Sequence, residues 1–289
     1  MEYLLHILII TGIYMILALS LNLIVGYTGL PALGHAAFSA MGAYTSSLLA
    51  LNWGISPWIG LVAGALMASM LGAVIAFPTL RLKGDYLALA TLGAGVIVYS
   101  VAKNWVGLTR GPMGLPGIPG FSIFGFDLSG LWSYLILVVL FVLLTYFVIG
   151  RVVNSPFGRI LRGIREDEIA TQAMGKNVDR HKVQVFVIGA FFAGIAGSLY
   201  AHYITFIDPS SFTVMESITI LLMVVFGGLG SLPGSFVGAA VLVILPEMLR
   251  FLGMPSSVAA PLRQMIYGLL LVVLMLKRPQ GMLGKYRIR

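Results

Sequence analysis

Long apolar runs, separated by short Gly- and Pro-rich segments, dominate the pattern of this chain. From Tyr3 to Leu80 the sequence contains no Asp, Glu, Lys or Arg. A helix rises ~1.5 Å per residue and the hydrocarbon core of a bilayer is ~30 Å thick, so about 20 apolar residues cross it once. A water-soluble domain could not contain such a stretch, because the stretch offers no charged side chains for a surface. The pattern therefore predicts a polytopic membrane protein.

Nine apolar runs are candidate membrane spans. We expect all of them to be helices, because lipid offers no water to satisfy open backbone groups and none of the runs alternates as a barrel strand does. The predicted spans are residues 3–25, 35–51, 57–77, 86–102, 131–150, 183–206, 217–231, 234–250 and 261–276. The expected fold class is all-α and polytopic, with about nine transmembrane helices, Gly/Pro-interrupted segments and a single transmembrane domain over residues 1–289.

The basic residues predict the orientation of the chain. Fourteen of the 18 Lys and Arg residues lie in the 78–85 loop, the 150–182 loop and the C-terminal tail, and with nine spans these segments share one side. The positive-inside rule makes that side cytoplasmic, so the N-terminus is expected outside and the C-terminus inside. The other four are Lys103, Arg110, Arg250 and Arg263. The net charge of +8 thus fits membrane orientation, and we expect no nucleic-acid partner.

The composition excludes several classes of function. The chain is 59% hydrophobic, only 10% charged and has no cysteine, so thiol catalysis and zinc-thiolate sites are excluded. It contains no Gly-x-x-x-x-Gly-Lys-Ser/Thr motif, and its four histidines are scattered. Glu247 lies in an apolar run with Arg250 one turn later, which predicts a neutralised structural pair. We expect no enzyme, no cofactor and no metal.

Two Gly-rich breaks interrupt the apolar runs, at residues 26–35 and 227–234. Paired interruptions in two halves of a transporter indicate a substrate site near the bilayer midplane, whereas the alternative is a pair of tight cytoplasmic turns. His35 either lines a path or is a hydrogen-bonded structural residue. The candidate residues of the translocation path are Asn22, Gly26, Tyr27, Thr28, Gly29, Gly34, His35, Gly227, Gly228, Gly230 and Gly234.

The cytoplasmic loop 151–182 predicts an amphipathic helix. Ser155 and Pro156 suit its N-cap and first turn, and Gly175 suits its end. The helix could rest on lipid headgroups, but its acidic cluster at 166–168 favours docking to a protein. The candidate coupling residues are Arg162, Arg165, Glu166, Asp167, Glu168, Ala170 and Gly175.

Five segments, in this order along the chain, resemble one family. They are residues 26–38, 81–92, 114–119, 162–175 and 225–234, and together they resemble the LivM-type permeases of branched-chain amino-acid ABC importers. The resemblance implies a LivH-like second permease, two cytoplasmic ABC ATPase subunits and an extracytoplasmic substrate-binding protein, assembled in the plasma (inner) membrane. It also implies inward transport of branched-chain amino acids by alternating access.

The resemblance assigns the coupling role to the loop. ABC importers use a Glu-Ala-Ala-x-x-x-Gly type motif, and this chain has a looser form in Glu168, Ala170 and Gly175, with Ile169 in place of the first Ala. Related permeases move urea, short amides or sugars, so these substrates stay open. An ion-coupled secondary transporter and a membrane-embedded enzyme are the rival classes, and the spans offer no convincing ion-coupling or paired acid/base residues for either.

Overall fold

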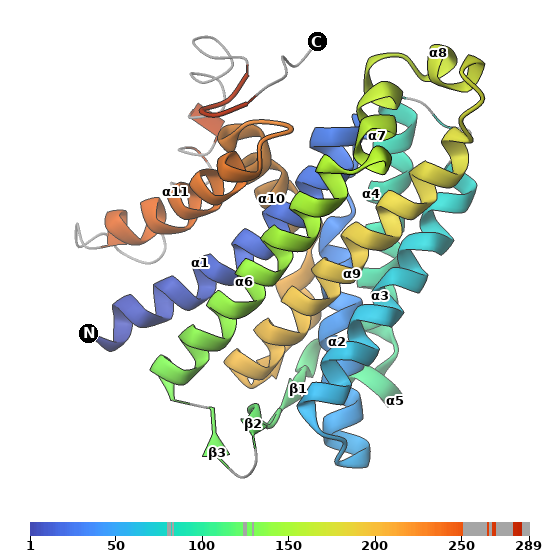
Figure 1. The fold of residues 1–289 in the computed structure, drawn as a ribbon. Helices are drawn as coiled ribbons and strands as arrows, with labels where there is room; N and C mark the ends of the chain where they lie inside the picture. The colour runs from blue at the N-terminus through green and yellow to red at the C-terminus, as the bar shows by residue number, and fades with distance from the viewer. Residues whose placement is uncertain are drawn as a thin grey trace.

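Helices make up most of this computed structural model, which describes residues 1–79, 82, 84–123, 126–128, 130–250, 265, 268, 269 and 280–284. The elements of the first half are α1 (Glu2–Leu21), η1 (Asn22–Tyr27), α2 (His35–Trp53), α3 (Pro57–Thr79), α4 (Asp85–Asn104), α5 (Val106–Thr109), η2 (Gly111–Met113), β1 (Leu115–Pro116), β2 (Ser122–Ile123) and β3 (Phe126–Asp127). Those of the second half are α6 (Leu131–Asn154), α7 (Pro156–Glu166), α8 (Glu168–Ala173), α9 (Val178–Ile204), β4 (Phe206–Ile207), η3 (Pro209–Phe212), α10 (Val214–Gly227) and α11 (Leu232–Arg250). Figure 1 shows their arrangement.

The helical fold class is confirmed. Among the described residues, six helical segments are long and apolar enough to cross a membrane, and α11 adds a shorter apolar helix over Leu232–Leu245. The predicted span 35–51 is a helix, α2, but its His, Ser, Thr and Asn residues make it too polar to qualify by composition. Most of the ninth predicted span, 261–276, lies outside the described residues, as do Arg81, Lys83, Arg263 and the basic residues of the C-terminal tail.

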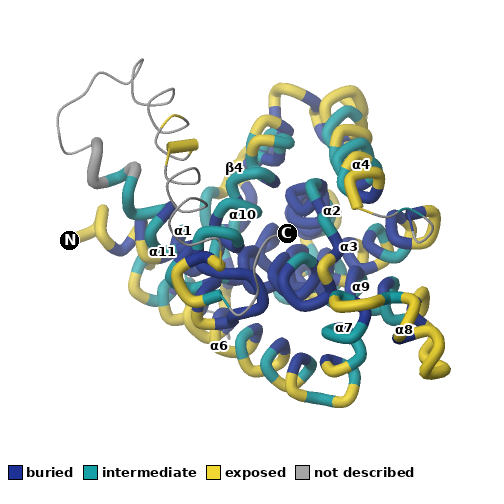
Figure 2. The backbone as a smooth tube through the Cα atoms, turned by 90° about the horizontal axis from the view of Figure 1, so that it is seen from above, coloured by how far each residue is buried: buried dark blue, intermediate teal, exposed yellow. Residues whose placement is uncertain are grey.

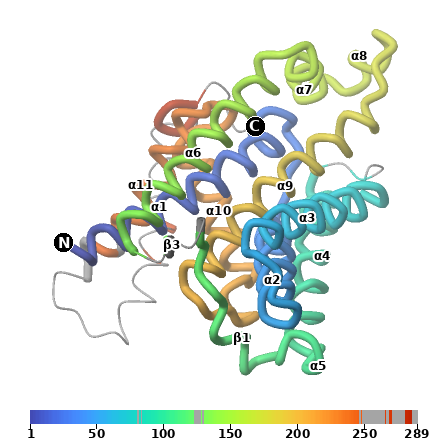
Figure 3. The backbone as a smooth tube through the Cα atoms, turned by 60° about the horizontal axis from the view of Figure 1, so that its bottom comes forward, coloured from blue at the N-terminus to red at the C-terminus, as the bar shows by residue number. Residues whose placement is uncertain are grey.

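Three helices, α2, α3 and α9, pack closely through small residues (Figure 3). A Cβ atom placed on Gly64 of α3 would lie 2.6 Å from the Gly42 carbonyl oxygen of α2, and one on Gly194 of α9 would lie 2.7 Å from Ala68 Cβ. Small residues let helix backbones approach in lipid, where van der Waals packing stabilises association. Gly64 therefore serves helix packing.

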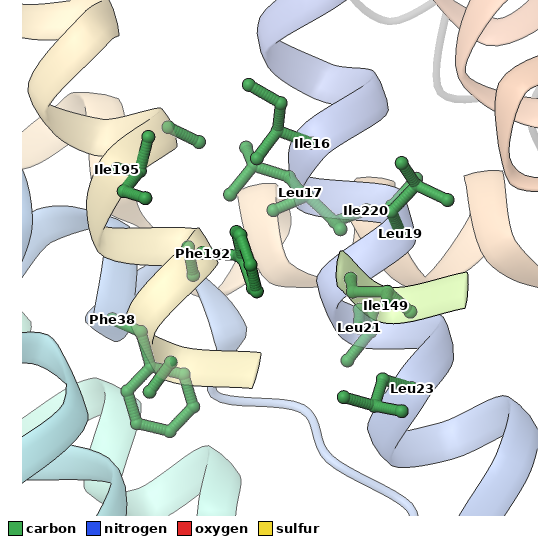
Figure 4. Packing of buried hydrophobic residues seen from close by; sticks show 14 of the residues in the cluster. Ile16, Leu17, Leu19, Leu21, Leu23, Phe38, Ile149, Phe192, Ile195 and Ile220 are labelled. Carbon is green, nitrogen blue, oxygen red and sulfur yellow. The ribbon is translucent and has the colours of Figure 1, made fainter. Parts of the chain in front are cut away.

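Helix α1 lies between the two halves of the bundle and contacts α6, α9, α10 and α11. From Ile9 to Leu21 nearly every residue of α1 is buried or half-buried, whereas several residues of its first two turns are exposed. Ile16 and Leu17 of α1 face Phe192 and Ile195 of α9 across an apolar layer (Figure 4). A helix that is apolar on every side is typical of a buried or membrane-embedded position.

The outer surface of the bundle is apolar too. Figure 2 shows buried residues at the centre of the bundle and exposed ones around it. Large apolar side chains on α3 and α6 are among the exposed residues, including Leu66, Met70, Phe77, Leu140 and Phe147. Exposed apolar surface of this extent suits contact with lipid or with another membrane subunit.

The two ends of the bundle differ. Helices α7 and α8 lie at one end, and α5 with the short strands lies at the other (Figure 1). The described residues between α4 and α6 are mostly non-helical, and β1 pairs antiparallel with β4, so that Leu115 lies opposite Ile207. This pairing attaches the segment to the end of α9.

Candidate translocation and coupling site

The two Gly-rich breaks meet inside the bundle, and Asn22 joins them. Its Nδ2 donates to the Ser231 carbonyl at 2.9 Å and to Ser235 Oγ at 2.8 Å, while its Oδ1 accepts from the Gly230 backbone N–H at 3.0 Å. Asn22 is fully buried, and these bonds use both of its donors and its acceptor oxygen. Sequence reasoning selected Asn22 and Gly230 but missed Ser231 and Ser235, which are ordinary polar residues without a local signal.

The first break begins later than the sequence predicts. Gly26 and Tyr27 are still helical, because residues 22–27 form a π-helical turn that continues α1. A Cβ atom on Gly26 would lie 2.6 Å from the Gly230 backbone nitrogen, so only glycine allows this approach. Single π-helical turns within α-helices are frequent at functional sites. Asn22 is the first residue of this π-helical turn, and its side chain contacts the second break.

The second break is held by a segment from much later in the chain. Gly228 has φ +118° and Gly230 has φ +71°, conformations that favour glycine. The backbone N–H groups of Met282 and Leu283 donate to the carbonyls of Phe226 at 3.0 Å and Gly227 at 2.9 Å. The last carbonyls of a helix have no partner within it, so residues 280–284 satisfy the end of α10.

Other predicted path residues lie apart from this junction. Gly34 packs against the backbone of Thr91 in α4, and Thr91 Oγ1 accepts from the Leu33 N–H at 3.0 Å. His35 is fully buried, and its Nε2 lies 2.8 Å from Ser20 Oγ. Thr28 Oγ1 donates to the Leu23 carbonyl at 3.2 Å. These contacts hold the first break in place, whereas Asn22, Gly26 and Gly230 make up its contact with the second.

Asn22→Leu is expected to lower the stability of the assembled permease by about 1–3 kcal/mol. The change keeps the volume but leaves the Gly230 N–H and the Ser231 carbonyl without this partner in a buried place. Hydrogen bonds between membrane helices average only ~0.6 kcal/mol, which favours the lower part of this range. Thermal unfolding of the purified complex in detergent would measure it.

The matched control is Thr11→Val, because Thr11 is equally buried on the same helix. Its hydroxyl donates to the Ile7 carbonyl at 2.7 Å within α1, so its loss leaves the junction untouched. Equal stability of the two variants would show that Asn22 does not hold the breaks together.

The predicted coupling helix is two helices, which corrects the single helix expected over residues 155–175. Ser155 caps α7 as predicted, accepting from the Gly158 N–H at 3.4 Å. The helix then ends at Asp167, which has φ −155° and whose Oδ1 accepts from the N–H groups of Ile169 at 2.9 Å and Ala170 at 3.0 Å. Asp167 therefore caps α8, because its short carboxylate satisfies the free N–H groups of the new first turn. Gly175, with φ +76°, follows the end of α8 as predicted.

Charge pairing in this region links α8 to α9. Within the described part of the chain, Arg162 forms no ion pair with Glu166; its Nη2 lies 3.4 Å from the Val153 carbonyl instead. Glu168 pairs with Lys182 of α9 at 2.7 Å, a contact that sequence reasoning missed. This pair anchors α8 to the start of α9.

Two large apolar side chains are exposed on α8 and just after its end. Ile169 is 70% exposed and Met174 is 69% exposed, and Ala170 and Gly175 are exposed beside them. Sequence reasoning treated Ile169 as a departure from a motif and did not consider Met174. Large apolar side chains this exposed, next to carboxylates, are typical of a surface that binds another protein.

The coupling region touches the first break through Arg165. A Cβ atom on Gly29 would lie 2.9 Å from Arg165 Cγ and 3.5 Å from Arg165 Cα, and Gly29 has φ +71°. The predicted coupling and path residues therefore form one continuous set: α8, α7 with Arg165, Gly29, the π-helical turn with Asn22, and Gly230. A displacement of α7 would reach the junction of the breaks through packed atoms.

Comparisons with known proteins identify the family of this chain. Residues 3–275 match the family model described as "Branched-chain amino acid transport system / permease component". The chain is 40% identical to the high-affinity branched-chain amino acid transport system permease protein LivM of Escherichia coli (strain K12), over 96% of this chain and 69% of that protein. It is 28% identical to a probable LivM of Methanocaldococcus jannaschii, over 94% and 90% of the two chains. It is also 25% identical to LivH of Escherichia coli (strain K12), over 94% and 91%.

Proposed function

Because this chain belongs to the permease components of branched-chain amino acid transport systems, we propose that it carries branched-chain amino acids into the cell as one half of an ABC importer. It is a multi-pass membrane subunit and is not itself catalytic. Its partners in this proposal are a LivH-like second permease, two cytoplasmic ABC ATPase subunits and an extracytoplasmic substrate-binding protein. Its similarity to both LivM and LivH supports a core of two related permeases.

The contact between Gly29 and Arg165 carries the proposed mechanism. The ATPase docks on α8 around Ile169 and Met174, and ATP-driven movement of the ATPases displaces α7. Arg165 passes this displacement to Gly29, and Asn22 passes it to the second break at Gly230. The permease halves then alternate between outward- and inward-facing states, and residues 1–289 act as one permease domain.

Uptake by the full complex tests this function. Proteoliposomes that hold both permeases and the ATPases, supplied with the binding protein, are expected to accumulate labelled leucine only when ATP is present on the ATPase side. Excess valine or isoleucine should compete, and excess urea should not. Accumulation driven by an ion gradient without ATP would instead identify a secondary transporter.

The proposed orientation places α7, α8 and the junction of the breaks at the cytoplasmic end. The basic residues of the 150–182 loop support it, because cytoplasmic loops carry the excess of Lys and Arg. A reporter active only in the cytoplasm should work when fused near Arg165 or after Arg289. The same reporter should be silent within residues 103–130, and activity at residue 115 would contradict the nine-span topology.

A further inference from the structure

A partly enclosed cavity lies away from the junction of the breaks, between α1, α2, α9, η3 and α10. Its volume is about 150 Å³. An engineered protein cavity of about that volume holds benzene, so this one has room for a small organic solute. Its lining includes the apolar side chains of Ile13, Leu17 and Phe212, together with Tyr14 and the carboxylate of Glu216. The cavity therefore combines apolar lining residues with a carboxylate.

Glu216 is the unusual member of this lining. It lies in the first turn of α10, and its Oε1 accepts from the Tyr14 hydroxyl at 2.5 Å. In the part of the chain that the structure describes, no Lys, Arg or His forms an ion pair with it. The positive end of the α10 dipole offsets only part of a carboxylate charge, by about 0.3–1 kcal/mol at an exposed site. An ionisable residue inside a membrane domain is a functional-site candidate because its burial is costly.

The neighbouring carboxylate, Asp208, does not compete for a ligand. Ser211 donates to its Oδ1 from both the backbone N–H at 3.2 Å and the hydroxyl at 2.7 Å. Burial raises the pKa of Asp208, but the hydrogen bonds from Ser210 and Ser211 outweigh it and hold that pKa below its ordinary value. Asp208 is thus satisfied within its own turn, and Glu216 is the carboxylate left to meet a cation.

The depth of the cavity fits a translocation path. Tyr14 lies near the middle of the continuous helix formed by α1 and η1, roughly 20 Å from either end at ~1.5 Å per residue. Substrate sites of many membrane transporters lie near the bilayer midplane. The junction of the breaks lies at the end of α1, so the cavity is a separate place on the same helix.

We propose that this cavity is a transit site that binds an amphipathic amino acid, with its ammonium group on Glu216 and its aliphatic side chain against Ile13, Leu17 and Phe212. This inference rests on the proposed function and adds a location and a recognition chemistry to it. The ammonium of the ligand supplies the counter-charge that Glu216 lacks, and Tyr14 orients the carboxylate. The apolar lining residues suit a branched aliphatic side chain.

Replacing the carboxylate tests the transit site. In the full complex, Glu216→Gln is expected to reduce ATP-driven leucine uptake at least tenfold, with assembly and ATP hydrolysis retained. Glu247→Gln is the matched control. Glu247 also lies in an apolar helix and also accepts a hydrogen bond from a tyrosine, Tyr3, but it does not line this cavity. The control should keep wild-type uptake. Wild-type uptake by Glu216→Gln, while the native complex transports leucine, would overturn the transit site and leave the proposed function intact.

A labelling experiment measures occupancy without altering Glu216. The chain has no cysteine, so Ser39→Cys places a single thiol on the cavity lining. Millimolar leucine is expected to slow its reaction with a small thiol reagent at least threefold, and Glu216→Gln is expected to abolish that protection. Absence of protection in the variant that keeps Glu216, in a complex that takes up leucine, would rule out binding here. Absence of leucine uptake by the native complex would contradict the proposed function itself.

Discussion

Ile169→Asp is expected to reduce ATP-driven uptake at least tenfold while the permease still inserts and folds. Ile169 is 70% exposed on α8, so a polar replacement costs the free permease little. In a docked complex the same position would be covered by the ATPase, and burying a carboxylate without a partner there costs several kcal/mol. Each 1.4 kcal/mol corresponds to a tenfold change in binding. Co-purification of the ATPase and uptake of labelled leucine would measure both effects.

A matched control separates docking from added charge. Asn154→Asp adds the same negative charge to an exposed position at the same end of the molecule, but at the end of α6 rather than on α8. It should leave docking and uptake near wild type. Reversal of Glu168 is a poorer probe, because it would also break the ion pair with Lys182. Normal ATPase binding by Ile169→Asp would show that the ATPase does not dock on α8.

Gly29→Val is expected to uncouple the importer: ATP hydrolysis continues, but leucine uptake falls at least tenfold. The valine side chain would meet Arg165, whose Cγ lies 2.9 Å from the position of the new Cβ. It would push α7 away from the first break, and so interrupt the contact through which displacement is transmitted. Parallel assays of hydrolysis and uptake in proteoliposomes would detect this split.

Backbone strain alone must be excluded as the cause, and Gly54 offers the control. Gly54 has φ +60°, close to the +71° of Gly29, but a Cβ atom there meets nothing within 4 Å. Both valine variants carry a similar strain, of roughly 1–2 kcal/mol, because side chains disfavour positive φ. Gly54→Val should therefore retain coupled uptake. Equal loss in both variants would count against a relay through Arg165.

The membrane class and the helix positions could be predicted because each rests on a local pattern. A stretch without charged residues from Tyr3 to Leu80 is far too long for the interior of a soluble domain, so it predicts membrane-spanning helices. Ser155 and Gly175 also have their predicted places, since caps and left-handed turns depend on single residue types. The break at Asp167 was missed although aspartate is a preferred N-cap, because Glu166 and Glu168 on either side of it suit a continuous helix equally well.

The candidate site depended on contacts that one sequence does not encode locally. Asn22 meets Ser235 and Gly230 across most of the chain, and no spacing rule predicts such a pairing. Glu216 was missed for a different reason. The sequence placed it in a connection before the predicted span 217–231, whereas α10 begins at Val214 and brings the carboxylate to the side of α1.

The contact of residues 280–284 with the end of α10 has a consequence for biosynthesis. The carbonyls of Phe226 and Gly227 receive their donors from Met282 and Leu283, which leave the ribosome only after the whole of α11. Until then these two carbonyls lack their donors, because the last carbonyls of a helix have no partner within it. The order of synthesis therefore makes this break one of the last parts of the permease to mature, after α1 and its Asn22 have already entered the membrane.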